Sequence, residues 1–255
     1  MQNHVLVERD AGIAIIRLNR PEKKNALTLA MYRSLIAALE QSETDDDVRV
    51  ILIAGSPDCF TAGNDLADFA AASSDGPRDA IHFLERLRAG EKPVIAAVEG
   101  LAIGIGTTLL LHCDLVYAGA GARFQLPFVN LGLCPEAGSS VILPAMVGHQ
   151  RAAELLFFGE PFGAQQARDF GLINQVLPDG NVFEFAMERA SQLAEKPVSA
   201  LRATKALLRR NSSASVADAM VEESRRFAEL LQGPDARQAM AAFLERSRQK
   251  SRSAG

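Results

Sequence analysis

Cysteine is scarce in this chain. The 255 residues include three cysteines, Cys59, Cys113 and Cys134, at wide spacings and without a Cys-x-x-Cys pair. A disulfide framework needs paired cysteines and a structural zinc site needs closely spaced ligands, so neither is expected. An odd number of widely spaced cysteines is typical of a reducing compartment, and we expect a cytoplasmic protein.

Long apolar runs are missing too. The longest candidate, residues 101–111, contains glycine and threonine and is shorter than the roughly 18 residues that suggest a membrane span. The first ten residues lack the basic and then apolar order of a signal peptide, and the last three match no peroxisomal tripeptide. We therefore expect no membrane partner.

Neither sign of charge dominates. Twenty-seven Lys and Arg residues stand against 31 Asp and Glu residues, for a net charge of −4 and a pI near 5.7. Nucleic-acid-binding proteins usually carry a basic surface, so no nucleic-acid partner is expected, although a local basic pocket for phosphates is compatible with this balance. The four histidines are scattered without ligand spacing, and no metal site is predicted.

What the chain does have is a strand and helix pattern typical of a layered α/β fold. Residues 5–9 and 13–19 predict a hairpin, and residues 48–54 and 93–98 predict two buried strands. Helices are expected at 28–41 and 77–88, short strands at 115–118 and 123–125, and a mobile stretch at 70–76. From residue 140 onward the pattern is helical, with helices predicted at 148–158, 163–170, 182–195, 199–209, 215–231 and 234–248. We expect a core over residues 1–195 and a helical region over 196–255.

Two segments share one local design. Residues 50–69 and 93–119 each read as an apolar strand, a loop of small residues and a helix. Backbone N–H groups at a helix start carry partial positive charge, and glycine lets a ligand approach them. Two such loops side by side could bind one carbonyl oxygen in an oxyanion hole. Taken alone, however, Gly104 and Gly106 are better explained by close helix–strand packing.

The combination of segments resembles the enoyl-CoA hydratase/isomerase (crotonase) superfamily, in order and spacing, over about residues 5–250. The segments that carry the resemblance are Arg20-Pro21, Asn25-Ala26-Leu27, Phe60-Thr61-Ala62-Gly63-Asn64-Asp65-Leu66, Val98-Glu99-Gly100 through Gly106, Cys113-Asp114-Leu115 and Gly171-Leu172-Ile173-Asn174-Gln175-Val176.

The resemblance implies a spiral of ββα units with a C-terminal helical trimerisation region, and a homotrimer or hexamer. It implies that the substrate is an acyl-CoA thioester and that no separate cofactor is needed. The backbone N–H groups of Ala62 and Ile105 would form the oxyanion hole. Lys24 would lie near the CoA phosphates, although an ordinary solvated lysine is an equal alternative. The substrate-binding set that it implies is Lys24, Ala62, Gly63, Asn64, Asp65, Leu66 and Phe128.

Two departures from the family bear on the reaction. Thr108 and Phe128 occupy the positions of the two acidic residues of a hydratase, and neither side chain exchanges a proton near neutral pH. One acid remains nearby, Glu136, in the sequence Pro135-Glu136-Ala137-Gly138. That stretch resembles the peroxisomal-type Δ3-Δ2-enoyl-CoA isomerase branch, in which the glutamate after the proline is the acid/base.

We therefore predict an isomerase in which Glu136 carries the proton. Hydration with atypical residues, thioester hydrolysis and non-catalytic acyl-CoA binding are the alternatives. His112 is better explained as a buried, hydrogen-bonded structural residue than as a partner of Thr108. Asp65 and Asp68 are better explained as helix caps than as catalytic acids.

Overall fold

The computed structural model describes residues 3–71 and 76–253. Its centre is a six-stranded sheet in the order β1-β2-β3-β5-β7-β10. The first pair is antiparallel, and every later pair is parallel. The strands are β1 (Val5–Asp10), β2 (Ile13–Leu18), β3 (Val50–Ala54), β5 (Val94–Val98), β7 (Leu115–Gly119) and β10 (Gln175–Leu177).

A second, four-stranded sheet has the order β4-β6-β8-β9. Its strands are β4 (Cys59–Thr61), β6 (Leu101–Ile103), β8 (Arg123–Gln125) and β9 (Phe162–Gly163). Three times in succession, a strand of the large sheet is followed along the chain by a strand of the small sheet. At the corner between β5 and β6, Gly100 has a φ of +61°, and a Cβ there would lie 1.9 Å from the carbonyl oxygen of Asp58. Only glycine fits this corner.

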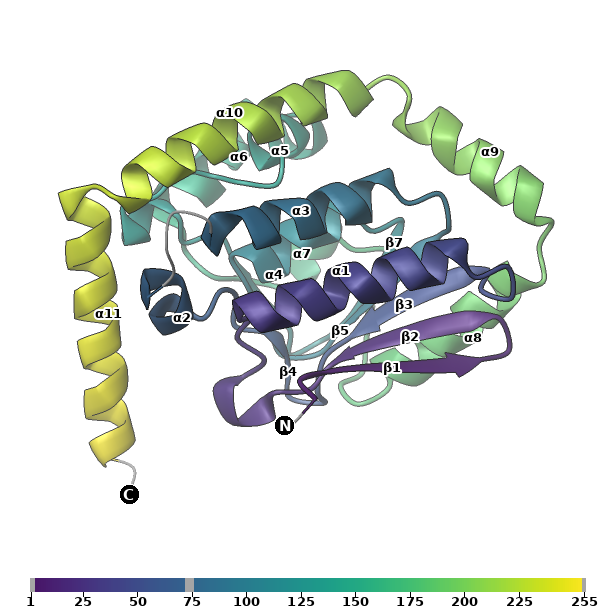
Figure 1. The fold of residues 1–255 in the computed structure, drawn as a ribbon, viewed down its shortest axis with the longest axis horizontal. Helices are drawn as coiled ribbons and strands as arrows, with labels where there is room; N and C mark the ends of the chain where they lie inside the picture. Colours follow the sequence, from purple (N-terminus) through teal and green to yellow (C-terminus); the bar gives the residue numbers. More distant parts are fainter. Residues whose placement is uncertain (1–2, 72–75, 254–255) are drawn as a thin grey trace.

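The large sheet is buried on both faces. Along β3, Ile51 and Ile53 pack on one side, while Val50 and Leu52 pack on the other, as the two-residue period of a strand requires. Helices α1 (Leu29–Thr44) and α3 (Gly76–Ala89) cover the first face, and α8 (Val182–Ala194) covers the second (Figure 1). The apolar run at 48–54 is explained by this double burial.

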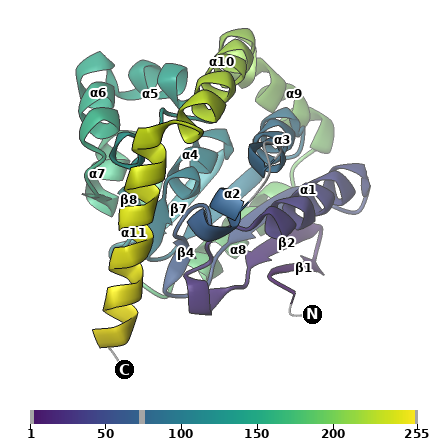
Figure 2. The same ribbon diagram turned by 60° about the vertical axis from the view of Figure 1, so that its left-hand side comes forward.

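The second half of the chain wraps helices around the small sheet and then returns across the first face. Helix α10 runs over α5, and α11 descends beside α2 and the η3 turn (Figures 1 and 2). The helices are α5 (Ser139–Val147), α6 (His149–Phe158), α7 (Ala164–Asp169), α9 (Val198–Arg209), α10 (Ser213–Leu231) and α11 (Pro234–Ser253). Lys205 fastens α9 to the core through a 2.8 Å ion pair with Asp114.

Short elements complete the chain. They are η1 (Pro21–Lys23), α2 (Leu66–Ala71), α4 (Ile105–Thr108), η2 (Leu109–His112) and η3 (Val129–Leu131). The helix expected after the small-residue loop within residues 93–119 is thus one α turn followed by a 3-10 turn. The expected mobile stretch at 70–76 falls mainly on residues 72–75, which lie outside the described residues. Within residues 3–71 and 76–253, no helix has the length and apolarity needed to cross a membrane.

Candidate active site

Glu136 lies in the loop between η3 and α5 and borders a small cavity. The cavity is walled by segments far apart in the sequence, because the loop after β4, the start of α4 and helix α10 converge on this point. Its lining consists of Asn64, Phe69, Ala80, Ile81, Ile105, Glu136, Ser224 and Phe227. Among these residues, Glu136 supplies the one carboxylate.

The backbone around Glu136 is held in an unusual conformation. Ala137 and Gly138 have φ values of +63° and +71°, a left-handed region that costs an alanine about 1–2 kcal/mol. Several hydrogen bonds hold the loop in place. His112 Nε2 lies 2.8 Å from the Ala137 carbonyl oxygen, and Ser139 Oγ donates to the Glu136 carbonyl oxygen at 2.6 Å. The loop is therefore fixed by its surroundings.

The surroundings of Glu136 make it a weak acid. Burial raises its pKa, the hydroxyl of Thr108 donates a hydrogen bond to Oε1 and lowers it, and the nearby Glu223 raises it, for a result of about 8. A carboxyl group with that pKa holds and releases a proton near neutral pH. Thr108, which we expected at the position of a hydratase acid, therefore contacts Glu136 directly.

Ala62, which the sequence analysis assigned to the oxyanion hole, uses its backbone N–H elsewhere. That N–H donates to the Lys24 carbonyl oxygen at 2.9 Å. The donor is therefore occupied inside the protein and does not face the cavity at Glu136, whose lining does not include Ala62.

Asn64, two residues later, has the opposite orientation. Leu27 forms a parallel bridge with Asn64, donating to the Gly63 carbonyl oxygen at 2.8 Å and accepting from the Asp65 N–H at 2.9 Å. Peptide groups alternate in direction along an extended segment, so the N–H of Asn64 points away from Leu27. Within the described part of the chain, no acceptor pairs with it.

Ile105 offers a second backbone donor. It is the first residue of α4, where N–H groups have no partner within the helix, and no described residue accepts from it. Gly104 precedes it with a φ of +57°. A Cβ on Gly106 would lie 2.6 Å from Thr61 Cγ2, so this glycine allows the two loops to meet. Asn64 and Ile105 then border the same cavity as Glu136.

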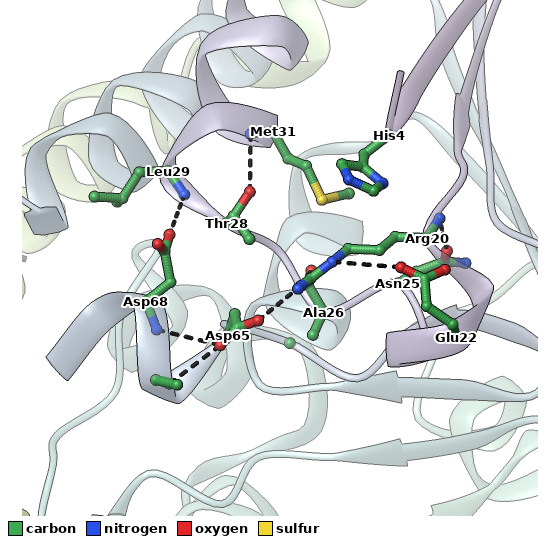
Figure 3. Close-up of polar contacts among 12 residues, drawn as sticks. His4, Arg20, Glu22, Asn25, Ala26, Thr28, Leu29, Met31, Asp65 and Asp68 are labelled. Carbon is green, nitrogen blue, oxygen red and sulfur yellow. Dashed lines mark hydrogen bonds and ion pairs between the residues drawn. The ribbon is translucent and has the colours of Figure 1, made fainter. Parts of the chain in front are cut away.

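Asp65 has a structural role (Figure 3). Its carboxylate accepts from Arg20 at 2.7 Å and from the backbone N–H groups of Ala67 and Asp68 at 3.1 and 3.2 Å. Burial alone would raise the pKa of Asp65, but these contacts lower it overall. Asp68 in turn accepts from the Leu29 N–H at 2.7 Å. The two aspartates tie the starts of α1 and α2 to the loop, so the cap reading is confirmed for Asp65.

Lys24 borders a different and larger cavity of about 630 Å³. This cavity shares no lining residue with the one at Glu136. Its lining includes Arg17 as a second cation, and consists of Arg17, Leu18, Asn19, Pro21, Lys24, Ser56, Pro57, Asp58, Cys59 and Leu101. Of the site residues predicted from sequence, Lys24 borders this cavity, and Asn64, Ile105 and Glu136 border the other.

The remaining predicted residues support these walls. Phe128 and Leu66 belong to an apolar cluster that also includes Phe227, and Phe128 does not border the Glu136 cavity. On Gly63, with a φ of +88°, a Cβ would lie 2.6 Å from the Ile103 carbonyl oxygen.

His112 is buried with its pKa lowered to about 4, chiefly by burial, and its ring contacts the backbone, as expected for a structural residue.

Sequence reasoning missed residues of distant helices that border this cavity or contact its lining. Tyr32 on α1 is fully buried and donates to Asn64 Oδ1 at 2.5 Å. Ser224 and Phe227 on α10 line the cavity directly. Their helical spacing matched that of ordinary core positions, so the pattern held no signal for a site. Across residues 3–71 and 76–253, no group of three or more potential metal ligands occurs.

Comparison with known proteins agrees with this geometry. The family model for enoyl-CoA hydratase/isomerase matches residues 8–252. The chain is 36% identical over 248 residues to the 2,3-dehydroadipyl-CoA hydratase of Escherichia coli, covering 96% of each protein. It is 39% identical over 215 residues to enoyl-CoA delta isomerase 2 of Rattus norvegicus, covering 81% of this chain and 54% of the rat protein.

A solved structure gives the same result for the fold. The Pseudomonas aeruginosa protein OdaA superposes with a TM-score of 0.91 at 45% identity, covering 95% of this chain and 99% of that one. The expected α/β crotonase fold is confirmed. The relatives include both hydratases and isomerases, so the comparison assigns the family and not the individual reaction. The chain belongs to the enoyl-CoA hydratase/isomerase (crotonase) family of acyl-CoA enzymes.

Proposed function

We propose that this protein is a Δ3-Δ2-enoyl-CoA isomerase in which Glu136 carries the proton. The observation that supports this most is one buried carboxyl group, of pKa about 8, in the lining of a cavity that Asn64 and Ile105 also border. The backbone N–H groups of these two residues have no acceptor among the described residues. A general acid/base works best when its pKa lies near the working pH. An isomerase needs one such group, because nothing is added to the substrate or lost from it.

The chemistry follows from these parts. The thioester oxygen accepts hydrogen bonds from the N–H groups of Asn64 and Ile105, which replace the pair Ala62 and Ile105 in our assignment. Glu136, as carboxylate, removes a proton from C2 of a 3-enoyl-CoA. The electron pair delocalises onto the thioester oxygen and along the double bond to C4. Glu136 returns the proton at C4, which leaves the double bond between C2 and C3.

The apolar walls suit a hydrocarbon chain. Phe69, Ile81 and Phe227 border the cavity beside the carboxyl group. Their exclusion of water would strengthen the hydrogen bonds to the developing enolate, since such bonds are worth more at low dielectric.

The larger cavity is our candidate for the nucleotide end of CoA. Lys24 and Arg17 border it, and cations are the side chains that attract phosphate groups. Remote contacts with the nucleotide would supply binding energy that holds the thioester between its two donors.

Hydration is the second candidate, because the Escherichia coli relative is named as a hydratase. Adding water requires one group to activate it and another to protonate C2. Glu136 is the one carboxylate among the residues that line the cavity, and the two hydratase positions hold Thr108 and Phe128. A single carboxylate in the cavity lining therefore favours isomerisation over hydration.

A spectrophotometric panel of 2- and 3-enoyl-CoAs of several chain lengths tests the proposal. Conversion of a 3-enoyl-CoA to the conjugated 2-enoyl-CoA raises ultraviolet absorbance, whereas hydration of a 2-enoyl-CoA lowers it. We expect the rise to be faster than the fall for every chain length accepted. Efficient hydration without isomerisation would contradict the reaction but not the family. Tight acyl-CoA binding without either reaction would indicate a binding protein.

A proline substitution tests the reassigned donor. Asn64→Pro removes that N–H, and loss of one oxyanion donor typically costs about 2.7–4 kcal/mol, or roughly 10²–10³-fold in kcat. Asn64→Ala is the matched control, because it keeps the N–H and changes only the side chain. Circular dichroism must show that both variants fold. An unchanged kcat in a folded Asn64→Pro protein would rule out this assignment.

A further inference from the structure

Helix α10 contacts the loop that carries Glu136 through a buried acid, Glu223, which has no part in the proposed reaction. Glu223 is 6% exposed, and its carboxylate accepts from the Gly138 N–H at 2.6 Å and from the Ser140 N–H at 2.9 Å. These two donors lie at the start of α5, two and four residues after Glu136. Among the described residues, Glu223 has no ion-pair partner.

The contact between α10 and this loop is close. A Cβ on Gly138 would lie 2.8 Å from Cγ1 of Val216, a side chain of α10. Glycine at this position therefore lets the loop approach the helix closely. One turn beyond Glu223, Phe227 borders the cavity at Glu136, as does Ser224. The same helix therefore forms part of the cavity wall and holds the loop that carries the acid.

From this arrangement we propose that Glu223 is a positioning residue for Glu136. It fixes the left-handed turn that aims Glu136 into the cavity, and its negative charge keeps Glu136 a stronger base. This inference rests on the proposed role of Glu136 and adds a second acid, which acts through the loop and does not touch the substrate.

The two effects have separate physical causes. The two hydrogen bonds hold Gly138 and Ser140, so losing them frees a turn that Ala137 adopts at a cost. The charge disfavours ionisation of Glu136, because two like charges in a buried region repel each other. The first effect concerns kcat at every pH, and the second concerns the pH at which the rate rises.

The other groups that face this pair do not change charge near neutral pH. Tyr32 comes from α1, and burial raises its pKa well above 10.0. His112 comes from η2, and burial lowers its pKa to about 4. Cys134 lies in the loop, and burial raises its pKa above 9.0. Arg226 on α10 forms an ion pair with Glu222 at 2.6 Å. A titration between pH 6 and pH 9 therefore reports on Glu136.

Three variants separate charge from positioning. Glu223→Gln keeps the shape and one acceptor oxygen but removes the charge. Glu223→Asp keeps the charge but shortens the reach to Gly138 and Ser140. Glu229→Gln is the matched control, because it removes a carboxylate from the same helix at an exposed position.

The first readout is the pH profile of kcat for isomerisation. The second is the infrared absorption of the protonated Glu136 carboxyl group, obtained by subtracting the spectrum of each variant that also carries Glu136→Gln. For Glu223→Gln we expect both midpoints to move to lower pH by about half a unit or more. For Glu223→Asp we expect the wild-type midpoints and a kcat at least about tenfold lower, since small misplacements of a reacting group are costly. Glu229→Gln should match the wild type.

The infrared titration needs no substrate, so it tests Glu223 even if the protein proves not to be an isomerase. Unmoved midpoints in Glu223→Gln would overturn the electrostatic role, and a wild-type kcat in Glu223→Asp would overturn the positioning role. Circular dichroism and thermal unfolding establish that each variant folds. If Glu223→Gln alone fails to fold, an infrared midpoint in Glu223→Asp below that of the wild type would contradict the proposal, because the charge is still present.

Discussion

Replacing Glu136 by glutamine should stabilise the folded protein, and the gain should depend on pH. The pKa of Glu136 is about 8 in the folded state, against 4.5 for an ordinary glutamate. Between these values the folded protein keeps a proton that the unfolded chain has released. The free energy of unfolding therefore falls as the pH rises, by about 1.4 kcal/mol per unit from this one group. Glutamine shows no such slope.

The size of the effect follows from the two pKa values. At pH 7 the free energy of unfolding of the wild type is lower by at most about 3 kcal/mol than that of a chain in which this position does not ionise. At pH 5 the loss is below about 1 kcal/mol, because pH 5 lies only slightly above the unfolded value. For a domain of this size, 1 kcal/mol moves the Tm by about 2–4 °C, so the variant should melt roughly 6–12 °C higher at pH 7.

Urea unfolding of both proteins at pH 5, 6 and 7, at equal protein concentration, measures this difference. Glu136→Gln should gain on the wild type with each step in pH, with equal m-values for the two proteins. A difference that stays constant across this range would show that Glu136 is not buried in its protonated form. The reasoning on its basicity would then be refuted.

Two other substitutions test the surroundings of the site. Thr108→Val removes a hydrogen bond that lowers the pKa of Glu136, so the rising limb of the kcat/KM profile should move above pH 8, and a profile that stays in place or moves down would contradict this. Lys24→Ala should raise KM for a CoA thioester on the order of tenfold, or about 1.4 kcal/mol, without a change in kcat. It should leave KM for a pantetheine thioester unchanged, and Lys23→Ala, at the exposed neighbouring position, is its control. Equal effects on both thioesters would remove Lys24 from the nucleotide site.

Several strands could be predicted from sequence because local patterns carry them, whereas the role of Glu136 was proposed from the resemblance of its short motif to a known family. The continuous apolar run at 48–54 reflects the burial of β3 on both faces. Glu136 stands in a short motif with glycine after it, and glycine at Gly138 is required by contact with α10. Such positions are visible in one stretch of chain.

The oxyanion donor could not be predicted in the same way. Gly63, with a φ of +88°, interrupts the extended backbone between Ala62 and Asn64. The directions of their two N–H groups therefore depend on this turn and on how Asn64 pairs with Leu27. The pairing is a long-range contact that leaves no mark on the spacing of residues. The short strands β4, β6, β9 and β10 were also not predicted, although β8, of three residues, was. Two or three residues give too short a pattern to show a period dependably.

The contacts that α1 and α10 make with the site could not be predicted, for a different reason. Glu223 sits on a helix among exposed acids such as Glu222 and Glu229, and nothing in the sequence distinguishes the one that turns inward. Tyr32 on α1 likewise has the sequence pattern of an ordinary buried core residue. Their roles depend on the packing of α1 and α10 against the loop that carries Glu136.

Proton exchange at C2 tests the central claim most directly. Wild type and Glu136→Gln are incubated with a 3-enoyl-CoA in deuterium oxide, and mass spectrometry follows isotope uptake while ultraviolet absorbance follows isomerisation. The account predicts that the variant loses at least about 10²–10⁴-fold in both rates, because its side chain can no longer accept the C2 proton. Exchange and isomerisation at the wild-type rates would show that the base is another residue.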